Sequence, residues 1–260
     1  MIVDKQLNYG RHQIARFLRE AAPFENVVDL GAGAGADLAL ARQVCPAAEL
    51  FAIEAYPSNV QKLREHYKVF SLDLERDPLP FADESIDVMI ANQVLEHVKE
   101  IFWIFHQASR VLRVGGRLII GVPNLASYHN RLLLLLGKQP TVIQNHSAHV
   151  RGFSKHDLLR FLDLVVPGGF ALRGFGGSNF YPLPPLLARP MARLLPSGAW
   201  GIFFLLEKRS RYAGEFLEFP LKQQLETNFY VGEAQTRQRG SECANYSPMS
   251  SFQMSGWALM

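Results

Sequence analysis

The sequence has few cysteines, no long apolar segment and little net charge. Its two cysteines, Cys45 and Cys243, lie far apart in 260 residues and lack the close spacing of metal-binding thiolates. This is typical of a protein from a reducing compartment. No run of apolar residues reaches the roughly 18 that a membrane-spanning helix needs, and the first residues lack the apolar core of a signal peptide. We therefore expect a cytoplasmic protein.

The charge and composition favour a globular protein that does not bind nucleic acid. The formal net charge is +3, and the sequence contains no dense basic stripe. Apolar residues make up 48% of the chain and charged residues 20%, which is ordinary for a globular core. We predict one domain over residues 1–209, a C-terminal extension over 210–235 and a disordered tail over 236–260. The tail is polar, rich in small residues and without a pattern.

A glycine-rich turn follows a short buried strand near the N-terminus. The strand is predicted over Asn26–Leu30, and Gly31, Gly33 and Gly35 follow at alternate positions. Glycines allow the backbone to turn sharply and to approach a ligand closely, and the helix that follows directs free N–H groups at that ligand. Asp29 stands at the end of the strand. Its carboxylate would repel a pyrophosphate and attract a cation or an amine.

Strands alternate with helices through most of the chain. The predicted strands are residues 26–30, 49–54, 68–73, 85–91, 117–122, 170–175 and 200–207. Right-handed βαβ units of this kind build a mostly parallel sheet. The fold class is therefore α/β, with a doubly wound, seven-stranded, Rossmann-like sheet and a small variable cap. We assign the cap to the segments near 125–155 and 178–198.

Polar residues recur where the predicted strands end. Asp29, Glu54, Asp73 and Asn92 each stand at the end of a different strand. In open α/β sheets, ligands bind outside the carboxyl ends of the strands. Four polar side chains at one edge are difficult to explain as core packing, and they indicate a ligand site.

Five motifs in order resemble those of class I S-adenosylmethionine-dependent methyltransferases. The resemblance covers roughly residues 9–207. Within this family, the chain is similar to the small-molecule branch, which includes quinone-biosynthesis and saccharide-cluster methyltransferases. The motifs are Asp29-x-Gly31-x-Gly33-x-Gly35, the acid Glu54, Asp73-Leu74, Asp87 to Asn92 with Leu95-Glu96-His97-Val98, and Leu112-x-x-Gly115-Gly116-x-Leu118. One glycine turn is weak evidence, whereas five motifs in order are strong evidence.

The resemblance implies a cofactor role for each strand-end residue. Asp29 would bind the α-amino group of S-adenosylmethionine. The glycine turn would let the backbone run close to the methionine portion and the ribose of the cofactor. The Glu54 carboxylate would accept hydrogen bonds from both ribose hydroxyls. Asp73 would accept from the adenine amine, and the Leu74 backbone N–H would meet a ring nitrogen.

Three further residues have less definite roles near the cofactor. Asn92 would contact the cofactor or cap the next helix. Tyr9 or Arg11 would cover the cofactor carboxylate from the first helix. The latter assignment rests on position alone.

The acceptor is expected to be a small molecule with an oxygen nucleophile, on a saccharide, a quinone or a lipid-linked compound. A base is needed only if that acceptor must lose a proton, and His97 and His149 are the candidates. Arg151 is a candidate cation for the acceptor. The sequence predicts no oligomeric state.

Histidines near residue 150 also raise the question of a metal. His146, His149 and His156 lie close in sequence, but this loop offers no cysteine or clear carboxylate cage. Glu96 and His97 are adjacent on a predicted helix, where neighbours do not face each other. We therefore predict no metal site.

Two other functions remain open. Gly31-x-Gly33-x-x-Ala36 also satisfies a loose dinucleotide fingerprint, so the alternative enzyme is an NAD(P)-dependent oxidoreductase. Against it, Asp29 would face the pyrophosphate. The other alternative is a non-catalytic methyltransferase-like partner subunit. A DNA methyltransferase is disfavoured because Asn92-Gln93-Val94 lacks the Pro-Pro-aromatic signature of amino-directed enzymes.

Two leucine-rich segments suggest contact with a lipid. Residues 132–136 and 181–196 would form a lid over a lipid-like acceptor or lie peripherally on a membrane. In the second segment, Arg189 and Arg193 stand four residues apart among leucines. The competing interpretation, which we favour, is a helix packed on the sheet.

Overall fold

The computed structural model describes residues 9–226 and 229–232, and the predicted tail over 236–260 lies outside them. The strands are β1 (Asn26–Leu30), β2 (Glu49–Ile53), β3 (Lys68–Phe70), β4 (Ile86–Asn92), β5 (Leu112–Pro123), β6 (Phe170–Ser178) and β7 (Gly201–Lys208). The helices are α2 (Arg11–Ala21), α3 (Ala36–Val44), α4 (Pro57–Leu63), α5 (Ile101–Val111), α6 (Tyr128–Leu135), α7 (Lys155–Val165), α8 (Pro185–Leu194) and α9 (Glu215–Lys222). Two short 3₁₀ helices are η1 (Leu95–His97) and η2 (Pro196–Gly198).

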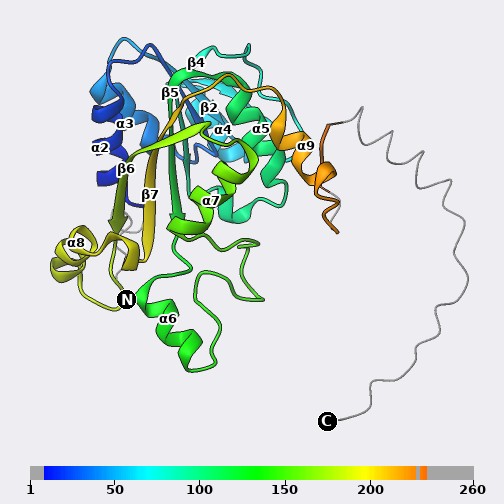
Figure 1. Cartoon of the computed structure of the whole chain (residues 1–260). Coiled ribbons are helices and arrows are strands. Elements are labelled where there is room, and N and C mark those ends of the chain that lie inside the picture. Colours follow the sequence, from blue (N-terminus) through cyan, green and yellow to red (C-terminus); the bar gives the residue numbers. More distant parts are fainter. Residues whose placement is uncertain (1–8, 227–228, 233–260) are drawn as a thin grey trace, which may run out of the picture.

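The strands form one sheet in the order β3-β2-β1-β4-β5-β7-β6. The pairs from β3 to β5 are parallel, whereas β7 pairs antiparallel with both β5 and β6. The prediction of a seven-stranded, mostly parallel sheet is confirmed. Helices cover both faces, with α2 and α3 on one side and α5, α7 and α9 on the other (Figure 1).

Strand alternation assigns each residue of β1 to one face of the sheet. Val27 packs in the core beneath α2 and α3, and Val28 packs in the opposite core beneath α5. Because side chains alternate along a strand, Asp29 shares the face of Val27. The same rule places Asn92 on this face, since Val88 and Ile90 of β4 also pack there.

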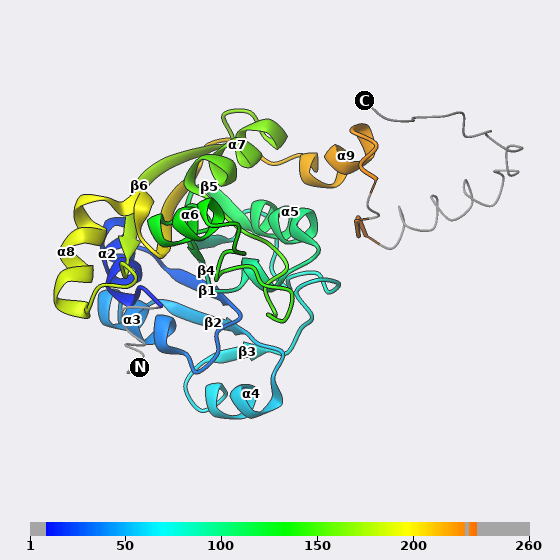
Figure 2. The ribbon, with the colours of Figure 1, turned by 90° about the horizontal axis from the view of Figure 1, so that it is seen from below.

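The register brings the carboxyl ends of the central strands together. Leu30 of β1 pairs with Ile53 of β2, so Glu54 follows directly beside the glycine turn. Asn92 ends β4 and pairs with Gly121 of β5. Figure 2 looks at this edge of the sheet, with α6 in front of it.

Several predicted strand boundaries are wrong, among them the end of the sixth strand, which lies at Ser178 rather than at residue 175. The third strand ends at Phe70 instead of Asp73, because Asp73 already belongs to a turn and its backbone oxygen accepts from Arg76 and Asp77. Gly115 and Gly116 of the fifth motif lie within β5, which begins at Leu112 rather than at the predicted residue 117. Gly115 has φ +81°, and a Cβ on Gly116 would lie 2.8 Å from the Arg113 oxygen, so this irregular strand segment requires glycine.

The two segments predicted to form a cap contain the helices α6 and α8. Ala188 and Ala192 of α8 are buried against the β6 side, which agrees with the prediction of a helix packed on the sheet. The opposite sides remain apolar and exposed, with Leu135 82% and Leu186 85% accessible. Among the described residues, no helix is long and apolar enough to cross a membrane.

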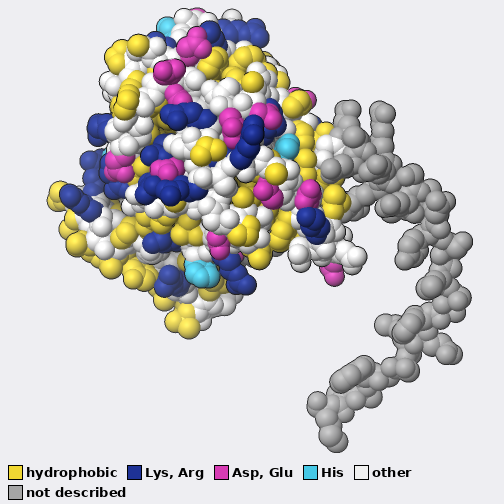
Figure 3. All heavy atoms as spheres, turned by 45° about the horizontal axis from the view of Figure 1, so that its top comes forward, with side chains coloured by type: hydrophobic (Ala, Val, Ile, Leu, Met, Phe, Trp, Pro, Cys, Tyr) yellow, Lys and Arg dark blue, Asp and Glu magenta, His cyan; other side chains and the backbone are white. Residues whose placement is uncertain are grey.

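An ion-pair cluster joins the antiparallel strands far from the glycine turn. Glu207 of β7 contacts Arg117 of β5 across the strand pair, and it accepts from Arg173 at 2.9 Å and Arg209 at 3.1 Å. On the face seen in Figure 3, Lys and Arg side chains are interspersed with Asp and Glu.

We predict that Glu207 makes folding stability depend on acid pH. The hydrogen bond from Arg173 and the neighbouring guanidinium charges lower the pKa of Glu207 to about 2. An unfolded glutamate titrates near 4.3. The contribution of ionised Glu207 to folding stability is therefore complete above about pH 4.3 and is lost as pH falls toward 2. Urea midpoints between pH 6 and 3 should fall less steeply for Glu207→Gln than for the wild type; equal slopes would contradict this.

Candidate functional site

The glycine turn takes a backbone shape that requires glycine. Gly31 and Gly33 have φ of +66° and +55°. A Cβ on Gly31 would lie 2.7 Å from Val94, whereas the nearest atom to a Cβ on Gly33 is the Gly31 oxygen at 4.0 Å. Gly31 is thus packed on its inner side, and Gly33 borders open space. A ligand can approach the backbone closely at Gly33.

Three carboxylates converge behind this turn. Asp29 is only 2% exposed, and Asp37 and Glu54 are also buried. Burial, and then the charges of Asp37 and Glu54, raise the pKa of Asp29 well above its usual range. Burial also raises the pKa of Asp37, although the Asn92 amide and Arg11 oppose the shift. Grouped acids of this kind favour a cationic ligand.

Sequence analysis missed Asp37, which joins the predicted residues to one another. The Asn92 amide donates to Asp37 at 2.8 Å and to the Tyr9 backbone oxygen at 3.1 Å. Arg11 Nε lies 3.8 Å from Asp37 Oδ1. The available signal was the position of Asp37 in the first turn of the helix after the glycines, where the helix dipole favours an acid.

Glu54 connects the end of β2 to the glycine turn. Its Oε2 accepts from the Gly33 N–H at 2.7 Å, and its Oε1 accepts from the Tyr56 N–H at 2.8 Å. These bonds fix the carboxylate at the mouth of the turn. Each carboxylate oxygen has a second lone pair with which it can accept from a ligand.

Asp73 and Leu74 lie at the margin of the site. Asp73 is exposed, and its Oδ1 accepts from the Glu75 N–H at 2.9 Å within the same turn. Leu74 is half-buried against the core beneath α5. The structure thus shows Asp73 as the cap of a local turn, and its adenine contact stays a prediction.

The two candidate bases lie together. The ring centroids of His97 and His149 are 4.8 Å apart, and Glu96 completes a group whose ligand atoms lie within 4.8 Å of one another. Glu96 and His97 are adjacent in the short 3₁₀ helix η1, and the expectation that they do not face each other is wrong for these ligand atoms, which lie within 4.8 Å. Burial raises the pKa of Glu96 to about 7, whereas burial lowers that of His97.

Arg151 fastens the loop that carries His149. Its guanidinium donates to the backbone oxygens of Val98 at 3.2 Å and Lys99 at 2.7 Å. The Val150 N–H donates to the backbone oxygen of Glu96 at 2.8 Å. Arg151, predicted as a cation for the acceptor, is therefore engaged in holding this loop beside η1.

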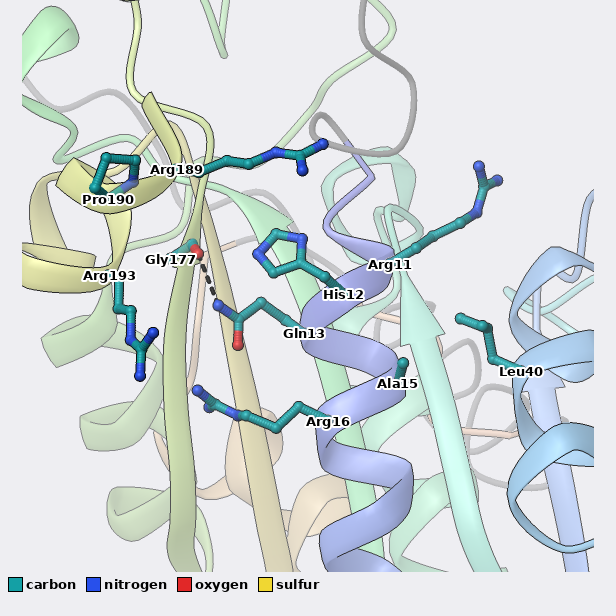
Figure 4. A pocket seen from close by; sticks show the side chains of 10 residues that line it. All are labelled: Arg11, His12, Gln13, Ala15, Arg16, Leu40, Gly177, Arg189, Pro190 and Arg193. Atoms are coloured by element: carbon teal, nitrogen blue, oxygen red, sulfur yellow. Dashed lines mark hydrogen bonds between the residues drawn. The ribbon is translucent and has the colours of Figure 1, made fainter. Parts of the chain in front are cut away.

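A basic cavity of about 730 Å³ opens between α2, β6 and α8 (Figure 4). Gln13 donates across it to the Gly177 oxygen at 2.8 Å. Four arginines line it, two from α2 and two from α8: Arg11, Arg16, Arg189 and Arg193. Arg11 also contacts Asp37, so the cavity adjoins the acidic cluster.

Part of the chain is similar to known methyltransferases. A family model described as a methyltransferase domain matches residues 28–120, which include the glycine turn and η1. An arsenite methyltransferase of Halobacterium salinarum is 40% identical over 108 residues, covering 38% of this chain and 27% of that protein. A probable S-adenosylmethionine-dependent methyltransferase of Mycobacterium tuberculosis is 30% identical over 171 residues, covering 62% and 58%.

The fold is also shared with solved structures. A SAM-dependent methyltransferase from Archaeoglobus fulgidus superimposes with a TM-score of 0.51 at 13% identity, covering 76% of this chain and 94% of that one. The chain spans from about a quarter to somewhat over half of the length of these two curated relatives. The match to the methyltransferase domain model covers residues 28–120, and the sheet built around them has the Rossmann-like fold seen in solved structures of S-adenosylmethionine-dependent methyltransferases.

Proposed function

We propose that this chain transfers a methyl group from S-adenosylmethionine to an oxygen nucleophile of a small-molecule acceptor. The observation that carries the proposal is the convergence of Asp29, Asp37 and Glu54 behind a glycine turn that a ligand can approach. S-adenosylmethionine is the cofactor of the matching family. It carries an ammonium and a sulfonium, and it has no phosphate to be repelled.

The residues present fit that cofactor. Asp37 Oδ1 and Asn92 Oδ1 are buried without a hydrogen-bond partner in the described part of the chain, so acceptors for a polar ligand remain. Asp29 and Asp37 would hold the α-amino group. Glu54 would accept from the ribose hydroxyls with its remaining lone pairs. A pyrophosphate in the same position would face three acids, which disfavours the dinucleotide alternative.

Positioning carries most of the catalysis in this proposal. The sulfonium supplies an already activated methyl group, and an in-line displacement requires the acceptor oxygen to be aligned with it. The ends of β1 and β2 would hold the cofactor, and η1 follows Val94, whose side chain packs against Gly31, so His97 and His149 would serve the acceptor. These histidines would promote loss of the acceptor proton.

Two features favour a lipid-linked acceptor among the classes considered, which also include saccharides and quinones. Exposed leucines on α6 and α8 provide an apolar surface at the cap. The arginine-lined cavity lies under α8 and would suit an acidic group on the acceptor. An acceptor with an apolar tail and an anionic head would contact both the leucine surface and the arginine-lined cavity. If such an acceptor is taken from a membrane, the protein would contact the membrane surface.

Replacing Glu54 with alanine should weaken binding of S-adenosylhomocysteine. The substitution removes hydrogen bonds to a charged group, each contributing about 1.5–3 kcal/mol, so the dissociation constant should rise roughly 10- to 100-fold. Calorimetric titration measures this change. Glu49→Ala is the matched control because Glu49 lies at the opposite end of β2, exposed and paired with Lys68. An unchanged affinity for Glu54→Ala with the fold intact would refute the site assignment.

His149→Ala should lower methyl transfer while leaving S-adenosylhomocysteine affinity within about twofold. Removal of a group that assists proton transfer typically costs 10²- to 10⁴-fold in rate. The assay follows labelled methyl from S-adenosylmethionine into lipid and aqueous fractions of a cell extract. His146→Ala, an exposed histidine of the same loop, is the control. Cofactor binding without labelling of any small molecule by the wild type would instead favour the partner-subunit alternative.

A further inference from the structure

The cluster of Glu96, His97 and His149 has the composition of a metal site. Glu96 and His97 come from η1, and His149 comes from a loop more than fifty residues later in the chain. Two imidazoles and one carboxylate are the three protein ligands of many zinc sites and of non-haem iron sites. None of the three belongs to the acidic cluster behind the glycine turn.

The backbone orients both imidazoles for metal binding. His97 Nδ1 lies 3.3 Å from the Ala148 oxygen, and His149 Nδ1 lies 2.7 Å from the Val142 oxygen. A carbonyl oxygen only accepts, so the ring proton of each histidine resides on Nδ1. The lone pair on each Nε2 is thereby available to a ligand. Metal-binding histidines are commonly fixed by this kind of backbone hydrogen bond.

The carboxylate supplies the second, independent observation. Glu96 is 1% exposed, and its Oε2 is buried without a hydrogen-bond partner among the described residues. A buried polar atom of this kind is costly, and an ion is one of the few explanations for it. Ordinary packing of two histidine rings would account for the ring contact but leaves this oxygen unexplained.

We propose that Glu96, His97 and His149 bind a divalent transition-metal ion such as Zn²⁺. The nitrogen-rich ligand set favours such ions over Mg²⁺ and Ca²⁺, which prefer oxygen ligands. Bonds of about 2.1 Å would require the ligand atoms to lie within about 4.2 Å of one another. In the structure, the ligand atoms of the three residues lie within 4.8 Å of one another, so a small side-chain rotation would bring them to metal-binding distances.

The site is open on one side. Glu96 is buried, whereas His149 is half-buried and His97 is exposed. Three protein ligands with an open position are typical of catalytic rather than structural metal sites. The open position would take an oxygen of the acceptor.

The role of the ion in acceptor binding rests on the proposed methyl transfer. The ion would bind the acceptor hydroxyl and lower its pKa, so that the proton leaves to solvent. The oxygen then forms a bond to the methyl carbon as the carbon–sulfur bond breaks, and S-adenosylhomocysteine leaves. In this account His97 and His149 are metal ligands and take up no proton themselves.

The direct test is titration of the tag-free, full-length protein with Co²⁺. Co²⁺ bound by nitrogen and oxygen ligands absorbs visible light, so binding is followed by absorbance. The wild type should develop this absorption at one equivalent, and Zn²⁺, but not Mg²⁺, should abolish it. His149→Ala and Glu96→Gln should each weaken Co²⁺ binding at least tenfold. Two separate variants guard against loss of the fold in one of them.

The control is His146→Ala combined with His156→Ala, which removes two exposed histidines from the same region and keeps the proposed ligands. It should bind Co²⁺ like the wild type. The metal site is refuted if the wild type binds no more tightly than His149→Ala, or if the control loses binding equally.

Titration with S-adenosylhomocysteine separates the two proposals. Normal cofactor affinity without Co²⁺ binding would overturn the metal site and leave the proposed methyl transfer standing. If the ion binds, methyl transfer should fall at least tenfold after chelation and return with Zn²⁺ or Co²⁺. Full activity in the metal-free protein would overturn the role of the ion.

Discussion

The repulsion among three buried carboxylates is the constraint on which the site depends. Asp29, Asp37 and Glu54 are placed together where water is scarce, and burial with mutual repulsion raises the pKa of Asp29. Arg11 is the cation that lies near Asp37, at 3.8 Å, and the Asn92 amide and the Gly33 N–H supply neutral donors. A ligand that brings positive charge relieves this repulsion, and one that brings phosphate increases it.

Strand register places these acids together. Side chains alternate along β1 and β4, so Asp29 and Asn92 face the same side as α2 and α3, while their neighbours fill the opposite core. The parallel pairing of β1 with β2 then aligns Glu54 with the glycine turn. Packing of the two apolar cores therefore determines on which face of the sheet each polar side chain lies. The helices that cover each face determine which other residues it contacts.

Sequence patterns predicted the parts of the fold that depend on local periodicity. Strand β1 matches its predicted range of residues 26–30, since a short buried strand followed by glycines has a clear pattern. Contacts distant in sequence were less accessible. Nothing local indicates that Asp37 meets Asn92, or that the loop near residue 149 reaches η1 through Arg151. The start of β5 before Gly115 and Gly116 was not predicted, because a helix end and an irregular strand both use glycine.

The most direct test of the account is calorimetric titration of the purified chain with S-adenosylhomocysteine, with NADH as the comparison ligand. The acidic cluster predicts micromolar binding of S-adenosylhomocysteine and no binding of NADH. Binding of NADH instead would contradict the account, because a pyrophosphate would then be accommodated beside Asp29. Binding of neither ligand would show that the glycine turn and its three carboxylates do not form a cofactor site.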